Sequence, residues 1–241
     1  MIELCSLADD EPALAFSPLL RGFQKTFAYL GEHGSIGLTP SKAFKRNFVH
    51  WAAAEFDWPG HTEADLFAVN KVLNEQDFMP LGDIHFLLTT LKMGRHYKGQ
   101  FKLTKAGTEL IGQPGRIFGI VTPFYLFEVN HARFSRFDDE PILGHWDVFL
   151  NVLNVETEDG ATGADLRQVL FGEPNPGDRF DQELSNLYIQ VLRPLCWTGL
   201  LEETRAKGLL RTRESIFTKT PLWRAALRLE TDGMVQRERR H

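Results

Sequence analysis

The sequence of 241 residues predicts a mainly α protein that also carries small β-hairpins. Apolar residues recur at helical spacing in segments that begin at a capping residue or end at glycine, as helices do. In each half, two short extended pieces around a turn follow the helices, which is the pattern of a β-hairpin. Because this order of elements occurs twice, the sequence favours a tandem repeat of one small module.

The first half predicts, in order, a helix, a short strand, two helices, a hairpin and a final helix. Ser17 caps the first helix, and Pro18 takes its first position, where proline is favoured. The hairpin turns at Lys98-Gly99, and Thr104 caps the helix that follows. The expected ranges are helices 17–31, 39–55, 80–93 and 105–111, a strand at 36–38 and the hairpin at 94–104.

The second half predicts the same plan. Lys207-Gly208 is expected at the tip of its hairpin, and Pro194 is expected to kink or end its third helix. Leu103-Thr104-Lys105 matches Phe217-Thr218-Lys219, so the exits of the two hairpins are aligned there. The expected ranges are helices 144–155, 162–171, 181–197 and 221–229, with hairpin strands at 199–203 and 215–218.

This order of elements is that of a winged helix, a helix-turn-helix variant in which a β-hairpin forms the wing. We therefore expect tandem winged helix-turn-helix repeats, residues 1–129 and residues 130–241, joined by an apolar linker helix around residues 117–127. That stretch is shorter than the ~20 residues that span a bilayer, so no membrane association is expected. Two unrelated small helical domains are the alternative architecture.

Four segments of the first half resemble a known family: Gly37-Leu38-Thr39, Lys45-Arg46-Asn47-Phe48-Val49, Leu87 to Leu91, and Leu103-Thr104-Lys105-Ala106-Gly107. Over residues 35–128 the chain is similar to the winged-helix region that accompanies plasmid open-reading-frame-three-like and SEC-C-type proteins of bacteria. The resemblance implies a winged-helix fold and a bacterial, plasmid or phage-like context. It implies no reaction, because that family has no well-defined catalytic residues to carry over.

Charge is distributed unevenly along the chain. Overall, 27 Lys and Arg against 32 Asp and Glu give a net charge of −5, which disfavours a generic polyanion binder. Residues 193–241, however, contain 11 basic and 6 acidic residues, whereas residues 137–183 contain 2 basic and 12 acidic ones. The run from Lys92 to Lys105 has five basic residues and no acidic one. The acidic total therefore conceals two basic wings.

From these wings we expect a non-catalytic bacterial or phage regulator that binds DNA, mainly through phosphate contacts. The third helix of each repeat offers few polar side chains for reading base edges, and Gln190 and Arg193 are the best candidates. The expected nucleic-acid-binding residues are Arg95, Lys98, Lys102, Lys105, Gln190, Arg193, Arg205, Lys207, Arg211 and Arg213.

The alternative function is a protein-protein interaction or adaptor module without DNA binding, because winged helices also serve as adaptors. The 19 Phe and 5 Trp residues leave open a protein partner or a homodimer, although filling the cores is the simpler explanation. We expect no enzyme, no metal and no cofactor, since the sequence lacks a metal-binding or nucleophile motif. Two distant cysteines and an acidic N-terminus predict a cytoplasmic protein.

Overall fold

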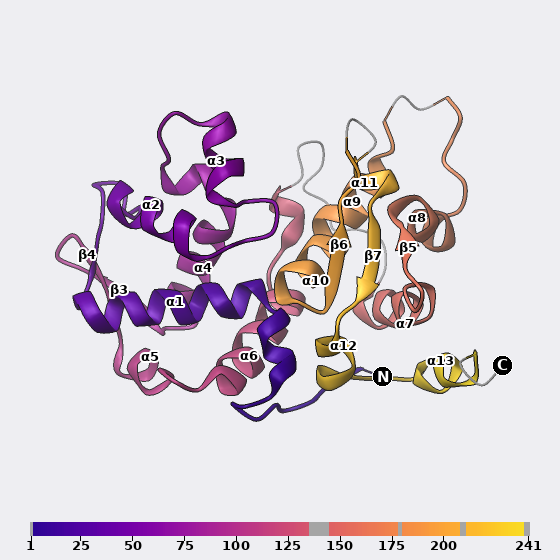
Figure 1. The fold of residues 1–241 in the computed structure, drawn as a ribbon, viewed down its shortest axis with the longest axis horizontal. Coiled ribbons are helices and arrows are strands. Elements are labelled where there is room, and N and C mark those ends of the chain that lie inside the picture. The colour runs from indigo at the N-terminus through magenta and orange to yellow at the C-terminus, as the bar shows by residue number, and fades with distance from the viewer. Residues whose placement is uncertain (1, 135–144, 178–179, 208–210, 239–241) are drawn as a thin grey trace. The chain divides into compact units, whose positions relative to one another are not determined.

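The structure is a computed structural model that describes residues 2–134, 145–177, 180–207 and 211–238. It divides the chain into two compact units (Figure 1). The N-terminal unit comprises residues 8–121, and the C-terminal unit comprises residues 1–7 together with residues 122–241. These bounds differ from the expected division after residue 129, because residues 1–7 and 122–129 group with the C-terminal unit. The mainly helical architecture with small antiparallel sheets is confirmed.

The N-terminal unit follows the predicted order of elements around a small antiparallel sheet. Ser17 caps its first long helix by accepting a hydrogen bond from the Leu20 amide, and Gly34 ends that helix with a φ of 74°. Its sheet has the order β2-β4-β3. The elements are η1 (Pro12–Phe16), α1 (Pro18–His33), β2 (Ile36–Gly37), α2 (Arg46–Glu55), α3 (Glu63–Val69), η2 (Glu75–Asp77), α4 (Met79–Thr90), β3 (Gly94–Tyr97), β4 (Gln100–Leu103), α5 (Lys105–Glu109) and α6 (Pro114–Pro123).

Helix α4 is the centre of the N-terminal unit. It packs against α1, η2 and β3, and its side chains Leu81, Ile84, Leu87 and Leu88 are all 0% exposed. A helix that is apolar on nearly all sides is a core helix. Helix α4 therefore presents little polar surface, consistent with the thin set of base-reading residues expected from the sequence.

The C-terminal unit has a second three-stranded sheet, of order β5-β7-β6, and a two-stranded sheet in which β1 pairs with β8. Neither β1 nor β8 is predicted by the sequence, and β8 occupies the end of the expected helix 221–229. The elements are β1 (Ile2–Leu4), η3 (Phe124–Glu128), η4 (His131–Phe134), α7 (Trp146–Glu156), β5 (Ala161–Thr162), α8 (Gly163–Phe171), α9 (Gln182–Leu187), η5 (Tyr188–Leu192), α10 (Arg193–Thr198), β6 (Leu201–Thr204), α11 (Arg211–Glu214), β7 (Ile216–Lys219), α12 (Pro221–Ala226), β8 (Leu227–Leu229) and α13 (Asp232–Glu238).

The two three-stranded sheets have the same register. In the N-terminal unit, Phe101 on the central strand lies between Ile36 and His96. In the C-terminal unit, Phe217 lies between Ala161 and Glu203 in the same way. Both phenylalanines are 0% exposed, so each fills the core beneath its sheet.

The residue that follows the central strand of each sheet is a threonine that caps the next helix. Thr104 donates its amide to the Met93 carbonyl at 3.0 Å and caps α5 through its hydroxyl. Thr220 donates its amide to the Leu200 carbonyl at 3.1 Å and caps α12. These pairings match Thr104 with Thr220. The expected alignment of Thr104 with Thr218 is therefore wrong by two residues. It rests on the identical Thr-Lys dipeptide, whereas the pairing of the strands matches Thr104 with Thr220.

The second hairpin differs from its expected form. Strand β7 begins at Ile216 rather than Ser215, and the short helix α11 lies between β6 and β7. The predicted tip includes Gly208, which lies outside the described residues. The two strands are thus joined by a long connection and not by a tight turn.

The expected linker helix at residues 117–127 is split between the two units. Helix α6 continues at Pro123 into the π-helical turn η3, whose Tyr125 and Leu126 are buried and which packs against α10. None of the helices in the described part of the chain combines the length and apolarity needed to cross a membrane.

Candidate nucleic-acid interface

The register of the first sheet separates the residues of the hairpin into two faces. Arg95 lies directly opposite Lys102, and Tyr97 lies opposite Gln100, so these four side chains share one face. His96 and Phe101 share the other face, which covers the core. Arg95, Tyr97 and Gln100 are exposed, and Lys102 is half-buried. The hairpin therefore presents a basic, partly aromatic surface to solvent.

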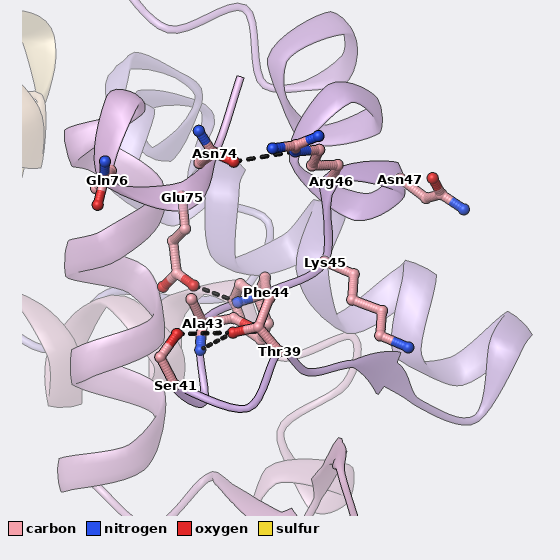
Figure 2. Close-up of a pocket in the computed structure, with 10 residues that line it drawn as sticks. All are labelled: Thr39, Ser41, Ala43, Phe44, Lys45, Arg46, Asn47, Asn74, Glu75 and Gln76. Atoms are coloured by element: carbon pink, nitrogen blue, oxygen red, sulfur yellow. Dashed lines mark hydrogen bonds between the residues drawn. The ribbon is translucent and has the colours of Figure 1, made fainter. Parts of the chain in front are cut away.

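Lys45 extends this surface across the third strand. Gly37 pairs with Gln100, and a Cβ added to Gly37 would lie 2.9 Å from Cδ of Lys45. The lysine stem thus lies over the glycine, on the outer side of the sheet. Figure 2 shows the Lys45 side chain extending away from Glu75. A larger residue at position 37 would displace the flexible lysine stem from this position.

The tip of the hairpin adds a fourth cation. Lys98 and Gly99 have φ values of 47° and 72°, the left-handed pair that a tight two-residue hairpin needs. The Lys98 ammonium lies 5.4 Å and the Arg95 guanidinium 5.6 Å from the centre of the Tyr97 ring. We call the set Lys45, Arg95, Tyr97, Lys98, Gln100 and Lys102 the basic face.

The basic face contains no acidic residue. Within the described ranges, no ion pair is formed by Arg95, Lys98 or Lys102. Lys105, which we also expected to bind nucleic acid, lies on α5, is 94% exposed and pairs with Glu109 at 3.9 Å. The structure therefore brings Arg95, Lys98 and Lys102 together and places Lys105 on a separate element.

A hydrogen-bonded chain of titratable side chains lies beneath the hairpin. Nδ1 of His85 is 2.6 Å from a carboxylate oxygen of Glu75, and Nε2 of His85 is 2.8 Å from Nε2 of His96. Glu75 and His85 are buried, whereas His96 reaches the surface. Burial lowers the pKa of His96, and the neighbouring His85 and Lys42 lower it further, while Glu75 opposes them.

Aromatic and backbone contacts hold this chain in place. The Phe44 ring stacks on the His85 ring at 3.9 Å, and its amide donates to the second carboxylate oxygen of Glu75 (Figure 2). A cleft of about 640 Å³ opens beside Glu75, where Arg46 donates to Asn74 at 3.0 Å. No local pattern in the sequence predicts this arrangement, because Glu75, His85 and His96 come from three separate elements.

The two residues expected to contact bases in the C-terminal unit are buried. Gln190 is 6% exposed and Arg193 is 9% exposed. The Arg193 guanidinium lies 5.2 Å from the centre of the Trp197 ring, within the same helical stretch. The two side chains expected to read bases are therefore buried in this structure and are not presented on an exposed helix face.

The remaining predicted residues of the C-terminal unit are scattered. Arg205 is half-buried and bonded to Glu203 at 3.1 Å. Lys207, Arg211 and Arg213 are exposed, the last two on α11. Register matches Arg95 with Glu202 and Lys102 with Thr218, so the outer face of the second sheet lacks those cations. A cationic sheet face is a property of the N-terminal unit.

No cluster of three or more His, Cys, Asp or Glu side chains in the described parts of the chain is arranged to hold a metal ion. The groups that the basic face brings together are four cations, one amide and one tyrosine. Such groups contact phosphate and sugar in nucleic-acid complexes.

Comparison with known proteins shows the relationship of the chain. Residues 15–116 match the family described as the Y4jL N-terminal domain, and residues 135–221 match the y4jL C-terminal domain. The uncharacterized protein y4jL of Sinorhizobium fredii is 39% identical over 171 residues, which cover 71% of this chain and 78% of the relative. No solved structure matches the chain. From these matches over most of its length, the chain belongs to the y4jL family.

Proposed function

We propose that this protein is a non-catalytic DNA-binding regulator whose basic face contacts the DNA backbone. The observation that carries this proposal is the direct pairing of Arg95 with Lys102 across the hairpin. Like charges directly opposite each other destabilise a sheet. A polyanion lying on the face would neutralise both side chains, together with Lys45 and Lys98. It would thereby remove the repulsion between them, which favours the bound state.

We also propose that the two units are winged-helix repeats. Each unit has a helix, a short strand, further helices and two longer strands, and the sheets share one order and one register. These similarities support two diverged winged-helix repeats. The resemblance to the winged-helix region beside SEC-C-type proteins is consistent with that assignment. In this assignment the hairpin of β3 and β4 is a wing, an element that commonly approaches the backbone or minor groove.

The proposed mode of binding is electrostatic, with little reading of sequence. The third helix of a winged helix normally presents polar residues to base edges. In α4 the exposed side chains are Met79, Phe86, Thr89 and Thr90, none of which makes the bidentate contacts that identify a base. We therefore expect similar affinity for unrelated duplexes and a strong dependence on salt concentration.

The first prediction concerns the double variant Arg95→Ala with Lys98→Ala. We expect a loss of DNA affinity of roughly tenfold or more at low salt. The slope of log affinity against log salt should flatten by about 2, because each lost phosphate contact removes about 0.9 from the slope. Fluorescence anisotropy with a labelled duplex over a salt series measures both quantities.

The matched control is Lys71→Ala, which removes an exposed lysine elsewhere in the same unit. It should leave both the affinity and the slope close to wild type. An unchanged slope in the double variant would contradict the assignment of the basic face. Absence of any salt-dependent binding in wild type would contradict DNA binding itself and favour a protein adaptor.

A further inference from the structure

The hydrogen bond between His85 and His96 ties the wing to the central helix. His96 lies on β3 and His85 lies on α4, and their Nε2 atoms face each other at 2.8 Å. A hydrogen bond between two nitrogen atoms contains one hydrogen. The link therefore forms when one of the two facing atoms carries a hydrogen and the other offers a lone pair.

Counting ring hydrogens shows when the link must break. Two neutral imidazoles carry two hydrogens, and Nδ1 of His85 donates one of them to Glu75. A third hydrogen can enter at Nδ1 of His96 without disturbing the link. A fourth makes both rings cationic and places two N–H groups face to face. The link thus tolerates one added proton and not two.

Neighbouring charged groups change the pKa of His96. Burial, His85 and Lys42, which lies in the connection after β2, all lower the pKa of His96, whereas Glu75 of η2 raises it. Arg95 neighbours His96 on β3, but its side chain lies on the opposite face of the hairpin. The Phe44 ring stacks on the His85 ring, and the Phe101 ring contacts both imidazoles edge-on. Two cationic rings whose Nε2 atoms lie 2.8 Å apart repel each other, so the second proton requires a lower pH than the first.

We propose that the contact between His85 and His96 is a pH-sensitive latch that holds the wing against α4 at neutral pH and releases it in acid. Release frees the hairpin of β3 and β4, which carries Arg95, Tyr97 and Lys98 of the basic face. The consequence for DNA rests on the proposed function, whereas the latch itself does not. Acid weakens the arrangement of the basic face even though it adds positive charge.

Hydrogen exchange of the hairpin amides in the full chain tests the latch. After correction for intrinsic exchange rates, protection of β3 and β4 should fall roughly fivefold between about pH 7.5 and about pH 5, the effect of losing one hydrogen bond. His96→Gln should remove this dependence, because glutamine can bond to His85 and does not titrate. The control His33→Gln, at an exposed histidine on α1, should behave as wild type.

Two results would overturn the latch: wild-type protection that is equal at both pH values, or the same acid loss in His96→Gln. A second arm measures DNA affinity at both pH values and constant ionic strength. Relative to His96→Gln, the wild type should lose affinity in acid, whereas simple addition of charge would raise it. If no DNA binds at any pH, the proposed function fails, and hydrogen exchange still decides the latch.

Discussion

His131 shows how a single buried residue makes the stability of the C-terminal unit depend on pH. Its Nε2 donates to the Tyr125 carbonyl at 2.7 Å, and the side chain is 4% exposed. Burial lowers the pKa of His131 from 6.5 to about 4, and the nearby Arg193 and Arg133 act in the same direction. The hydrogen bond to Tyr125 opposes this shift. Folding therefore favours the neutral imidazole.

The second prediction follows from that depressed pKa. The stabilisation is fully present above pH 6.5, the unfolded value, and is lost as the pH falls to about 4. Its size is about 3 kcal/mol. Urea unfolding of the C-terminal unit should show this loss in wild type and a much flatter pH dependence in His131→Gln. His145→Gln, at an exposed position, is the control that should keep the wild-type dependence. Parallel curves for wild type and His131→Gln would rule out this assignment.

At the scale of elements, α5 approaches the wing so closely that only glycine fits at one position. A Cβ on Gly107 would lie 2.0 Å from the carbonyl oxygen of Met93, a backbone atom that cannot move aside freely. Gly82, on α4 of the same unit, has no neighbouring atom within 4 Å of such a Cβ. The two glycines therefore test close packing and helix propensity separately.

The third prediction compares these two substitutions. Gly107→Ala should destabilise the N-terminal unit by about 2–3 kcal/mol, because α5 or β3 must shift. Gly82→Ala should stabilise it by about 0.5–1 kcal/mol, because alanine restricts the unfolded chain and favours the helix. Chemical denaturation of the full chain, followed at the transition of this unit, measures both. Equal effects of the two changes would show that the contact at Met93 is not restrictive.

The elements that were predicted well are those with local signals. Ser17 and Thr104 both cap helices as expected, and the Lys98-Gly99 turn is in place, because each depends on a few adjacent residues. The sequence does not identify Thr220 as a cap, because Thr218-Lys219 is identical to Thr104-Lys105 and therefore aligns with it. Strand register, which decides between them, depends on pairing with a distant segment.

The residues of the candidate site likewise divide into those with a local signal in the sequence and those that depend on contacts between distant segments. The cations Arg95, Lys98 and Lys102 are visible as a run in the sequence, and strand alternation places two of them on one face. Gln190 was expected to be accessible, yet its helix is buried by contacts from other elements, which no local pattern reveals. The bond between His85 and His96 likewise requires a strand and a helix to meet, so only the folded structure shows it.

At the scale of the whole molecule, the C-terminal unit is discontinuous in sequence. Ile2 pairs with Leu229, and Leu4 pairs with Leu227, so the N-terminal unit is inserted between β1 and the rest of the C-terminal unit. The Cys5 amide continues this ladder by donating to the Ala226 carbonyl at 2.8 Å. Residues 2–5 therefore stabilise the C-terminal unit, with which they pair, although it is the N-terminal unit that follows them directly in the sequence.

The fourth prediction is that removal of residues 2–7 destabilises the C-terminal unit and leaves the N-terminal unit unchanged. The deletion strips β8 of its partner strand, and a single strand has no stability of its own. Hydrogen exchange that resolves the two units should show loss of protection in β8 and α12, with β3 and β4 as the internal reference. Loss of protection confined to the N-terminal unit would contradict the pairing.

This arrangement has a consequence for synthesis on the ribosome. Strand β1 is made more than two hundred residues before its partner strand is completed at Leu229. At ~5–20 residues per second, that interval is roughly ten to forty-five seconds. During it the inserted unit has time to fold, whereas the nascent β1 keeps its backbone groups unpaired. A chain whose translation stops early would thus carry a folded domain beside an exposed strand edge, the kind of segment that chaperones bind.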